Sequence, residues 1–235
     1  MNPARDLDLP EVGGSRDWNG TPEDAKAYID AAREEERALW SAAFYSGLRA
    51  GELRALRVEN LHGLDDGDDE RWISVEHGWD DLEGEIAPKS AAGVRLVPMP
   101  ETLRSTLAAH VERTGRTGRD LVFGKTGTEP FVPWTIGDHA TKAWTKAKLP
   151  RITLHHARHG YRSFLEDAGI SEARADRYMG HASTKIGRRY THAIRGQLDA
   201  DAKQLDAYLV GDSASVVVLR PWKKATGAQT GAQAV

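Results

Sequence analysis

The segment MGHASTKIGRRYTH, at positions 179–192, ends a basic run on a tyrosine. Tyr190 directly follows Arg188 and Arg189, and His181 stands nine positions before it. A tyrosine is usually a half-buried packing residue with a polar tip, whereas arginines are common partners of a phosphate. What a phenol does in this company depends on which other groups the chain offers to a phosphate.

Basic residues also gather in TLHHARHGYRS, at positions 153–163. At about 100° per residue on a helix, the apolar side chains fall on one side: Leu154, Ala157, Tyr161, Phe164, Leu165 and Ala168. The adjacent side carries His155, Arg158, His159 and Arg162. His155 and Arg158, at positions i and i+3, can approach one small anion together. We therefore expect one face of this helix to pack and the next to present imidazoles and guanidiniums.

Zinc binding is a competing interpretation of this helix, because His155 and His159 have the i, i+4 spacing of two zinc ligands. Position 156 is a histidine, however, and not the glutamate of the H-E-x-x-H motif. The neighbouring arginines would also repel a dication. We therefore expect no metal site and no cofactor. A structural alternative, in which the histidines are only hydrogen-bonded at a helix cap, stays open.

Two further cations lie upstream. Arg49 stands at the junction of two apolar stretches in YSGLRAGELRAL, where it could simply pair with Glu52. Lys89 lies in APKSAAGVRLVPMP, at positions 87–100, a pattern that predicts a strand, a turn of small residues and a returning strand. A lysine at a hairpin tip is ordinarily solvated. Neither residue indicates a function by itself.

The composition is that of an ordinary globular protein, with 235 residues, 40% of them hydrophobic and 29% charged. With no cysteine, the chain can form neither a disulfide framework nor a thiol nucleophile. No apolar run approaches the roughly 20 residues of a membrane span, and the first residues lack the apolar segment of a signal peptide. We expect an intracellular, cytoplasmic protein that does not enter a membrane.

The net charge of -3 argues at first against a nucleic-acid partner, but the charges are unevenly distributed. Acidic residues concentrate at positions 63–70, whereas positions 142–195 hold twelve lysines and arginines against four acids. Such asymmetry is the electrostatic footprint expected of a protein that binds nucleic acid. A solvated surface of salt bridges is the alternative explanation.

The elements that must position these residues can be placed from periodicity, caps and turn formers. Thr21 and Pro22 mark the start of a first helix. Helices are expected at 21–37, 38–47, 50–58, 101–113, 135–148, 154–168, 172–178, 185–194 and 197–209, with a small antiparallel sheet at about 71–98 and a strand candidate at 215–222. The chain is predicted to be mainly α with this small antiparallel β-sheet, an α+β fold.

The order of the motifs is more specific than any one of them. SGLRAGEL, a lysine ahead of VRLVP, HHARH, and MGH with a tyrosine nine positions after its histidine together resemble the tyrosine recombinase (phage integrase) family, over roughly residues 21–209. The last segment closely follows that family's Leu-Gly-His…Tyr-x-His signature. His156, Ala157 and Met179 depart from the common pattern, but none stands where a phosphate contact is expected.

The resemblance implies that the chain has the fold of the tyrosine recombinase catalytic domain and cleaves and rejoins DNA through a 3′-phosphotyrosyl intermediate. Because a phenol has a pKa near 10, the nucleophile Tyr190 needs electrostatic help. The implied catalytic residues are Arg49 and Arg158 as the phosphate clamp, His181 as a hydrogen-bond donor, His155 in proton transfer, and Lys89 as the acid for the leaving 5′ oxygen. Glu52 and His159 would support them. Further DNA contacts are expected from Arg95, Lys142, Arg162, Lys185, Arg188 and Arg189.

The resemblance also implies partners and a domain plan. Double-stranded DNA carrying recombination sites is the expected partner, with a homo-tetramer on DNA, a monomer free in solution and accessory recombination factors. Residues 1–20 would be a linker or arm from a core-binding domain that is absent here, residues 21–210 the catalytic domain, and residues 211–235 a strand candidate, able to dock on a neighbouring protomer, with a disordered tail.

Two other functions fit the same residues. A type IB topoisomerase-like enzyme shares the chemistry, although the spacing from MGH to the tyrosine favours a recombinase. A non-catalytic DNA-binding module that keeps the fold is the third possibility, and the intact set of candidate catalytic residues argues against it.

Overall fold

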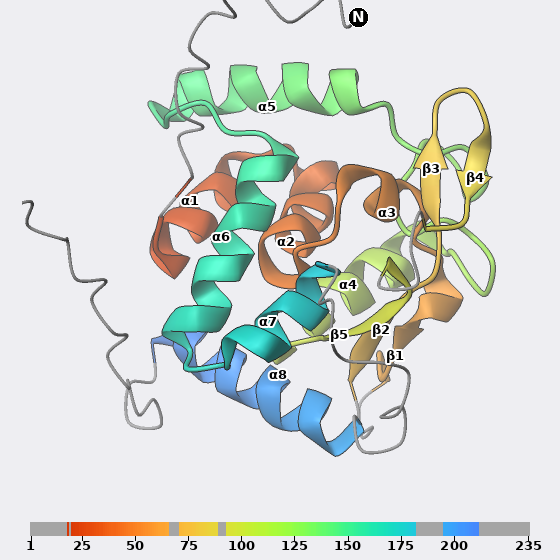
Figure 1. Ribbon diagram of the computed structural model, residues 1–235. Coiled ribbons are helices and arrows are strands. Elements are labelled where there is room, and N and C mark those ends of the chain that lie inside the picture. Colours follow the sequence, from red (N-terminus) through yellow and green to blue (C-terminus); the bar gives the residue numbers. More distant parts are fainter. Residues whose placement is uncertain (1–17, 19, 66–70, 89–92, 182–194, 212–235) are drawn as a thin grey trace, which may run out of the picture.

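The computed structural model in Figure 1 describes residues 18, 20–65, 71–88, 93–181 and 195–211. Its helices are α1 (Pro22–Ala31), α2 (Arg37–Ser46), α3 (Ala50–Ala55), α4 (Glu101–Thr114), α5 (Pro133–Ala147), α6 (Leu154–Asp167), α7 (Glu172–Met179) and α8 (Arg195–Val210), with 3-10 turns at Glu34–Glu36 and Val58–Asn60. The fold is mainly helical with small antiparallel sheets, as predicted. Among the described residues, no helix combines the length and apolar character that crossing a membrane would need.

The first predicted helix is split. Thr21 and Asp24 form a capping box at its start, with Pro22 in the first turn, as the sequence indicated. The helix ends at Ala31 and not near Arg37, because Ala32 is extended. Three consecutive glutamates then form a 3-10 turn. Their charges favour the start of a new helix, since a helix N-terminus carries partial positive charge.

Two small sheets replace the single predicted one. β1 (Leu61–His62), β2 (Trp72–Val75) and β5 (Arg95–Pro98) form an antiparallel sheet in the order β1-β2-β5, while β3 (Gly78–Asp80) and β4 (Gly84–Ile86) form a separate hairpin. The hairpin predicted across positions 87–100 is therefore wrong: β4 pairs with β3, and β5 returns to β2. The observed turn is stabilised by the Asp80 carboxylate, which accepts hydrogen bonds from two backbone N–H groups of the turn.

The core lies around α2, whose residues from Ala38 to Ser46 are all buried. In Figure 1 this helix is central, and its neighbours in the structure are α1, α4 and α6. Edge-to-face contacts join Trp40 and Tyr28 to Trp144 of α5. This packing leaves the end of α2, the short α3, strand β5 and the end of α7 together at the centre of the molecule (Figure 1).

The predicted helix at 197–209 is confirmed as α8. The helix predicted at 185–194 and the strand candidate at 215–222 lie outside the described residues. So does most of the predicted linker at 1–20.

Candidate active site

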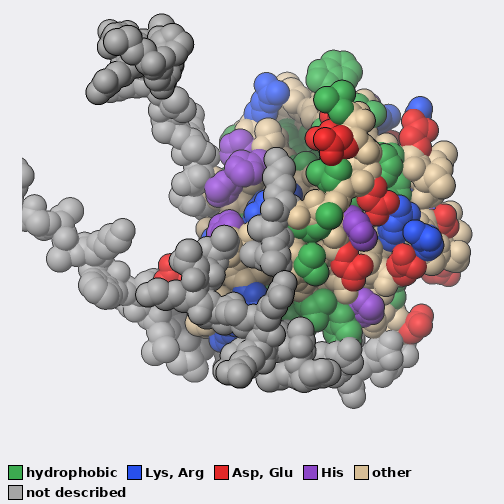
Figure 2. All heavy atoms as spheres, turned by 45° about the vertical axis from the view of Figure 1, so that its right-hand side comes forward, with side chains coloured by type: hydrophobic (Ala, Val, Ile, Leu, Met, Phe, Trp, Pro, Cys, Tyr) green, Lys and Arg blue, Asp and Glu red, His purple; other side chains and the backbone are tan. Residues whose placement is uncertain are grey.

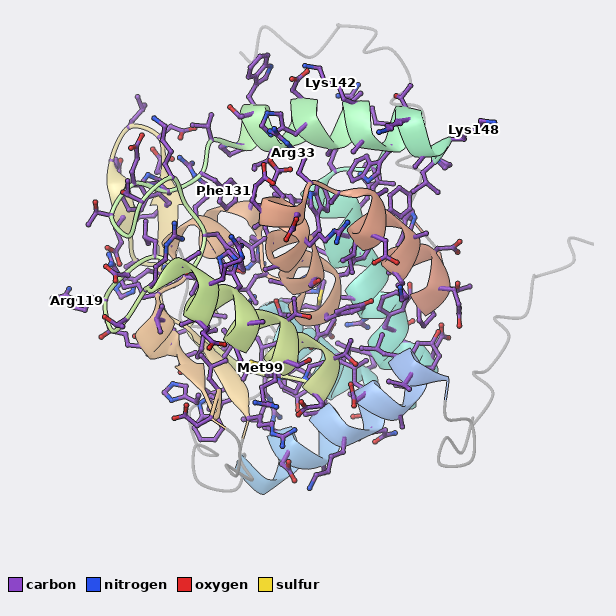
Figure 3. All side chains as sticks on the ribbon, turned by 180° about the vertical axis from the view of Figure 1, so that it is seen from behind. Arg33, Met99, Arg119, Phe131, Lys142 and Lys148 are labelled. Atoms are coloured by element: carbon purple, nitrogen blue, oxygen red, sulfur yellow. The ribbon has the colours of Figure 1, made fainter. Side chains whose placement is uncertain are left out.

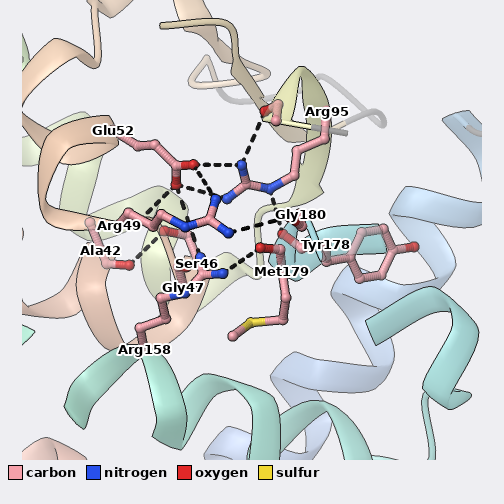
Figure 4. A network of polar contacts seen from close by, with 11 residues as sticks. Ala42, Ser46, Gly47, Arg49, Glu52, Arg95, Arg158, Tyr178, Met179 and Gly180 are labelled. Carbon is pink, nitrogen blue, oxygen red and sulfur yellow. Dashed lines mark hydrogen bonds and ion pairs between the residues drawn. The ribbon is translucent and has the colours of Figure 1, made fainter. Parts of the chain in front are cut away.

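Arg49 caps the N-terminus of α3 and is fixed by Glu52. Its backbone N–H donates to Glu52 Oε2 at 2.7 Å, and its Nη1 donates to Oε1 at 2.8 Å. The pairing that the sequence allowed is therefore present. The arginine side chain stays 45% exposed, and its Nη2 also donates to the carbonyl of Gly180 at 3.2 Å. Figure 4 shows these contacts, which hold one edge of the guanidinium.

Arg158 approaches Arg49 from α6. Its Nη1 donates to the carbonyl of Gly47 and its Nη2 to the carbonyl of Met179, so it joins the ends of α2 and α7. Gly47 is needed at this position, since its φ is +59° and a Cβ there would lie 2.3 Å from Cδ1 of Tyr161. The packing face predicted for α6 is confirmed, because all six of its apolar residues are buried. Arg158 itself is buried, whereas the sequence suggested an open face.

The electrostatics keep Arg158 cationic. Burial, and then the positive charge of Arg49, lower the pKa of Arg158 to about 10, while Glu52 opposes the shift. A guanidinium with that pKa is still protonated at neutral pH. An anion that reached it would be attracted strongly, because charges interact more strongly in a partly desolvated site than in water.

Arg95 is the third guanidinium of this cluster, and its position corrects a prediction. The sequence placed it among the DNA contacts, but its side chain is only 2% exposed. Its Nη1 and Nη2 donate to the two carboxylate oxygens of Glu52, each at 2.8 Å, and its Nε donates to the carbonyl of Tyr178 at 2.7 Å. Strand periodicity could have predicted this burial, because residues two positions apart on a strand share a face and Val97 is fully buried.

Glu52 is the carboxylate at the centre of the three arginines, bonded to Arg49 and Arg95 and 4.0 Å from Arg158. Burial would raise the pKa of Glu52, but the hydrogen bonds and charge of Arg95, with those of Arg49, outweigh it and lower the pKa to about 2. The group is therefore ionised at every physiological pH. Its hydrogen bonds run to Arg49 and Arg95, so the carboxylate holds both guanidiniums in place (Figure 4).

His181 follows the end of α7 and lies beside the same cluster. Its backbone N–H donates to the carbonyl of Asp176 at 3.0 Å, and its Nδ1 lies 3.6 Å from that residue's carboxylate. Burial and the charge of Arg158 lower the pKa of His181, while Asp176 opposes them. A lowered pKa favours the neutral imidazole, which has one N–H to donate, and the side chain is half exposed. The sequence analysis did not predict a role for Asp176, because a single acidic residue in a basic segment matches no recognisable motif.

His155 and His159 lie one turn apart on α6. Their Nε2 atoms are 2.9 Å apart, and the rings meet at 89°. Burial, followed by the charges of His159 and Arg158, lowers the pKa of His155. Within the described ranges, no three histidines, aspartates or glutamates gather as a metal-binding group. His155 is exposed and lies one turn from Arg158, and its role in proton transfer stays a prediction.

The other predicted DNA contacts are spread more widely. Arg162 Nε donates to Glu166 at 2.6 Å, and its Nη1 donates to Asp176. The guanidinium is therefore already ion-paired with two carboxylates. Lys142 is exposed on α5, where it pairs with Asp138 at 2.7 Å (Figure 3). Contacts of both residues with DNA stay predictions. Lys89, Lys185, Arg188, Arg189 and Tyr190 lie outside the described residues.

A pocket of about 400 Å³ opens beside Arg49. Its walls include Trp79 and Ile86 of the β3–β4 hairpin, and also Pro88 and Gly93, which stand just before and after positions 89–92. Pro88 and Gly93, the described residues that flank this segment in the sequence, both line the pocket with Arg49. Figure 2 shows several histidine side chains close together at the upper left of the molecule, and further histidines among the acidic side chains at its centre and right.

Comparison with known proteins identifies the family to which the chain belongs. The sequence profile of the phage integrase family matches residues 21–196. The chain therefore belongs to the phage integrase family, the tyrosine recombinases.

Curated relatives are prophage integrases. The prophage integrase IntR of Escherichia coli is 26% identical over 183 residues, which cover 68% of this chain and 43% of that protein. A putative prophage phiRv2 integrase of Mycobacterium tuberculosis is 25% identical over 182 residues, covering 75% of this chain and 48% of that protein. The matched part thus spans less than half the length of either relative.

Solved structures support the same fold. The Tn1549 transposon integrase, solved in complex with transposon right end DNA, matches with a TM-score of 0.60 at 19% identity over 82% of this chain and 69% of that one. The integrase from mycobacterium phage Brujita matches with a TM-score of 0.57 at 17% identity, over 87% and 66% of the two chains. The XerA recombinase matches with a TM-score of 0.53 at 21% identity, over 91% and 65%.

Proposed function

We propose that this chain cleaves and rejoins DNA strands as a site-specific recombinase of a mobile element, through a 3′-phosphotyrosyl intermediate. The observation that carries the proposal is a cluster of three guanidiniums around one carboxylate: Arg49 and Arg95 bond Glu52, and Arg158 lies 4.0 Å from it. Such a cluster retains net positive charge in a partly buried site. It suits the extra negative charge that develops on the non-bridging oxygens of a phosphate under attack.

Arg49 and Arg158 are the proposed clamp. Each donates two of its N–H groups to protein acceptors, and a guanidinium has five such groups. The protein can therefore hold each planar guanidinium while its remaining N–H groups stay available to donate to phosphate oxygens. His181 would donate a further hydrogen bond from its neutral imidazole. His155 would move a proton at the same phosphate, and His159 would orient it through their contact.

Tyr190 is the proposed nucleophile. The other five tyrosines of the chain are described, and burial raises the phenol pKa of every one: Tyr28, Tyr45, Tyr161, Tyr178 and Tyr208. A raised pKa disfavours the phenolate form of these five side chains. The spacing of the family signature assigns the role to Tyr190, nine residues after His181.

Lys89 is the proposed general acid, which would protonate the leaving 5′ oxygen. Pro88 and Gly93 line the pocket beside Arg49, and this supports a position for Lys89 near the phosphate. The reaction conserves the energy of the phosphodiester, so a free 5′-hydroxyl of another strand can rejoin it without a nucleotide cofactor. Because cationic side chains supply the charge stabilisation, we propose that no metal takes part.

The proposed partner is double-stranded DNA with recombination sites, bound by four copies that exchange strands in sequence with the aid of accessory factors. The site of action would be the cytoplasm of a bacterial cell. For this chain, residues 21–210 would form the catalytic domain, and Lys142, Arg162, Lys185, Arg188 and Arg189 would add contacts to phosphates.

A nicked suicide substrate tests the function. Wild type should become covalently attached to the 3′ end, and Tyr190→Phe should lose this adduct while it binds DNA as before. Tyr161→Phe is the matched control, because it removes a buried hydroxyl and should keep the adduct. An adduct that persists in Tyr190→Phe would refute the assignment. Relaxation of supercoiled DNA by a monomer, without strand exchange, would favour the topoisomerase alternative.

A further inference from the structure

We propose that Arg95 is a positioning residue of this site: it holds Glu52 in place, fixes Arg49 through it, and keeps the carboxylate from neutralising Arg158. The inference rests on the proposed function, since it adds a residue that prepares the same phosphate clamp.

The first observation is the way in which Glu52 is bonded. Its Oε1 accepts from Nη1 of Arg49 and from Nη1 of Arg95, and its Oε2 accepts from the backbone N–H of Arg49 and from Nη2 of Arg95. Each oxygen therefore takes one hydrogen bond from each arginine. A fork with two parallel bonds fixes the plane of the carboxylate as well as its position, so the orientation of Arg49 depends on Arg95.

The second observation is that Arg95 also holds the end of α7. Its Nε donates to the carbonyl of Tyr178 at 2.7 Å. The next two carbonyls in this turn, those of Met179 and Gly180, accept from Arg158 and Arg49 respectively. Three successive carbonyls therefore accept hydrogen bonds from the three arginines, of which Arg95 and Arg158 are buried and Arg49 is half exposed.

Gly180 permits this arrangement. Its φ is +64°, and a Cβ at this position would lie 3.1 Å from Nη1 of Arg95 and 3.2 Å from its Cζ. A side chain there would be strained and would press on the guanidinium. The turn before His181 is thus shaped to receive Arg95 and not only to end the helix.

The third observation concerns the charge balance. Nη1 of Arg158 lies 4.0 Å from Oε2 of Glu52, farther than a hydrogen bond allows. Without Arg95, the buried carboxylate would lose two of its donors, and Arg158 is the nearby cation that could replace them. A direct pair between Glu52 and Arg158 would neutralise the cation that the phosphate needs. Arg95 prevents this pair by occupying Glu52 itself.

Arg95 does not act by touching DNA, because its side chain is only 2% exposed. Its backbone lies in strand β5, where it is paired with Val75 of β2. A matched control is available elsewhere. Arg104, on α4, is 11% exposed, grips Glu101 with Nε and Nη2 at 2.8 and 2.7 Å, and donates Nη1 to the carbonyl of Leu64. It has the same kind of fork and carbonyl bond, but its partners lie outside the cluster.

The test compares the wild-type chain with Arg95→Met, Arg95→Lys and Arg104→Met. Single-turnover formation of the covalent adduct on the nicked substrate should fall about 100-fold in Arg95→Met, the loss expected when catalytic groups are misplaced by about 1 Å. Its DNA affinity should change by less than about threefold, because the buried residue makes no contact with the backbone phosphates that set affinity. Arg104→Met should lose comparable thermal stability and keep its rate.

Arg95→Lys covers the case in which Arg95→Met does not fold. One ammonium cannot hold both oxygens in a plane, so the rate should fall at least about tenfold in a folded protein. In addition, the rate of adduct formation should begin to fall at a higher pH in either Arg95 variant than in wild type, because the Glu52 carboxylate loses a strong donor and is protonated more easily. A merely structural role of Arg95 would leave the pH dependence of the rate unchanged. Rates in the Arg95 variants equal to those of wild type or Arg104→Met would overturn the proposal.

A second readout separates this inference from the proposed function. Sulfate, used as the probe, should raise the melting temperature of wild type by binding the folded state. The shift should be smaller in the Arg95 variants and unchanged in Arg104→Met. If wild type forms no adduct, the proposed function fails, and the sulfate shifts still decide whether Arg95 prepares an anion site. Equal shifts in all proteins would refute the role of Arg95.

Discussion

The guanidinium of Arg158 stops 4.0 Å short of the Glu52 carboxylate, although both side chains are buried within the same cluster. Glu52 is engaged instead by Arg49 and Arg95, and Arg158 donates to backbone carbonyls. The consequence is an arginine with a fixed direction and without a directly bonded counter-ion. Such preorganised charge needs little rearrangement when a phosphate arrives, which is how electrostatic catalysis is most effective.

Glu52→Gln should lower the stability of the protein in a pH-dependent way. The pKa of Glu52 is about 2 in the folded protein, against an ordinary value of 4.5. A lowered pKa means that the ionised carboxylate stabilises the fold above pH 4.5 and that this contribution is lost as the pH falls toward 2. The variant should therefore be less stable by about 3 kcal/mol at pH 7.

Urea denaturation at pH 7, 5, 4 and 3 provides the measurement. The difference between the two proteins should stay constant from pH 7 to 5 and shrink at pH 4 and 3. A difference that is the same at pH 7 and pH 3 would show that the carboxylate charge is not what the arginines stabilise.

Two buried tyrosines offer a matched pair with opposite outcomes for stability. The hydroxyl of Tyr161 has no hydrogen-bond partner among the described residues, whereas that of Tyr178 donates to the Asp201 carboxylate of α8. Tyr161→Phe should leave the free energy of unfolding unchanged or raise it slightly, because it removes an unsatisfied group. Tyr178→Phe should lower it by about 1–3 kcal/mol, because a buried carboxylate loses a donor.

Thermal or urea unfolding of the two variants checks this pair, and both should still form the covalent adduct. Equal stability losses would mean that the Tyr161 hydroxyl does have a partner in solution. Loss of the adduct in either variant, with the fold intact, would count against Tyr190 as the nucleophile.

The sequence was most informative where local periodicity decides the structure. The packing face of α6 follows from the helical period, and the cap of α1 from Thr21 and Pro22. The pair formed by Arg49 and Glu52 was foreseeable because the residues are three positions apart in one helix start. In each case the residues that determine the structure are neighbours in sequence.

Long-range pairing was not foreseeable in the same way. A strand pattern does not say which strand is its partner, so β5 was assigned to the strand before it and not to β2. A charged residue is normally expected on the surface. Arg95 was therefore taken for a DNA contact, since the carboxylate that makes its burial possible lies 43 positions earlier. Strand β1 has only two residues, too few for an alternating pattern.

Cleavage should proceed in the presence of EDTA at the rate seen with magnesium. The proposed stabilisers of the transition state are Arg49, Arg158 and His181, and none of them needs a metal ion to carry or donate charge. Single-turnover assays in EDTA, in magnesium and in zinc test this, with ionic strength held constant because DNA affinity depends on salt. Activity that vanishes in EDTA and returns with zinc would revive the metal interpretation of His155 and His159.

A substrate with sulfur in place of the bridging 5′ oxygen separates the proposed roles of Lys89 and Arg49. A thiolate is a good leaving group that needs little protonation, since a thiol has a pKa near 8.5. If Lys89 is the general acid, Lys89→Ala should cleave the normal substrate slowly and the sulfur substrate at close to the wild-type rate. Loss of an arginine should not be rescued, because its proposed task is to stabilise charge on the non-bridging oxygens.

Arg49→Ala is the better comparison than Arg158→Ala, because Arg49 is half exposed and its removal leaves Glu52 bonded to Arg95. General acid catalysis contributes typically 10²- to 10⁴-fold, so the normal substrate should reveal a loss of about that size in Lys89→Ala. Single-turnover rates of both variants on both substrates complete the comparison. Equal rescue of the two variants, or none for Lys89→Ala, would remove Lys89 from the catalytic residues.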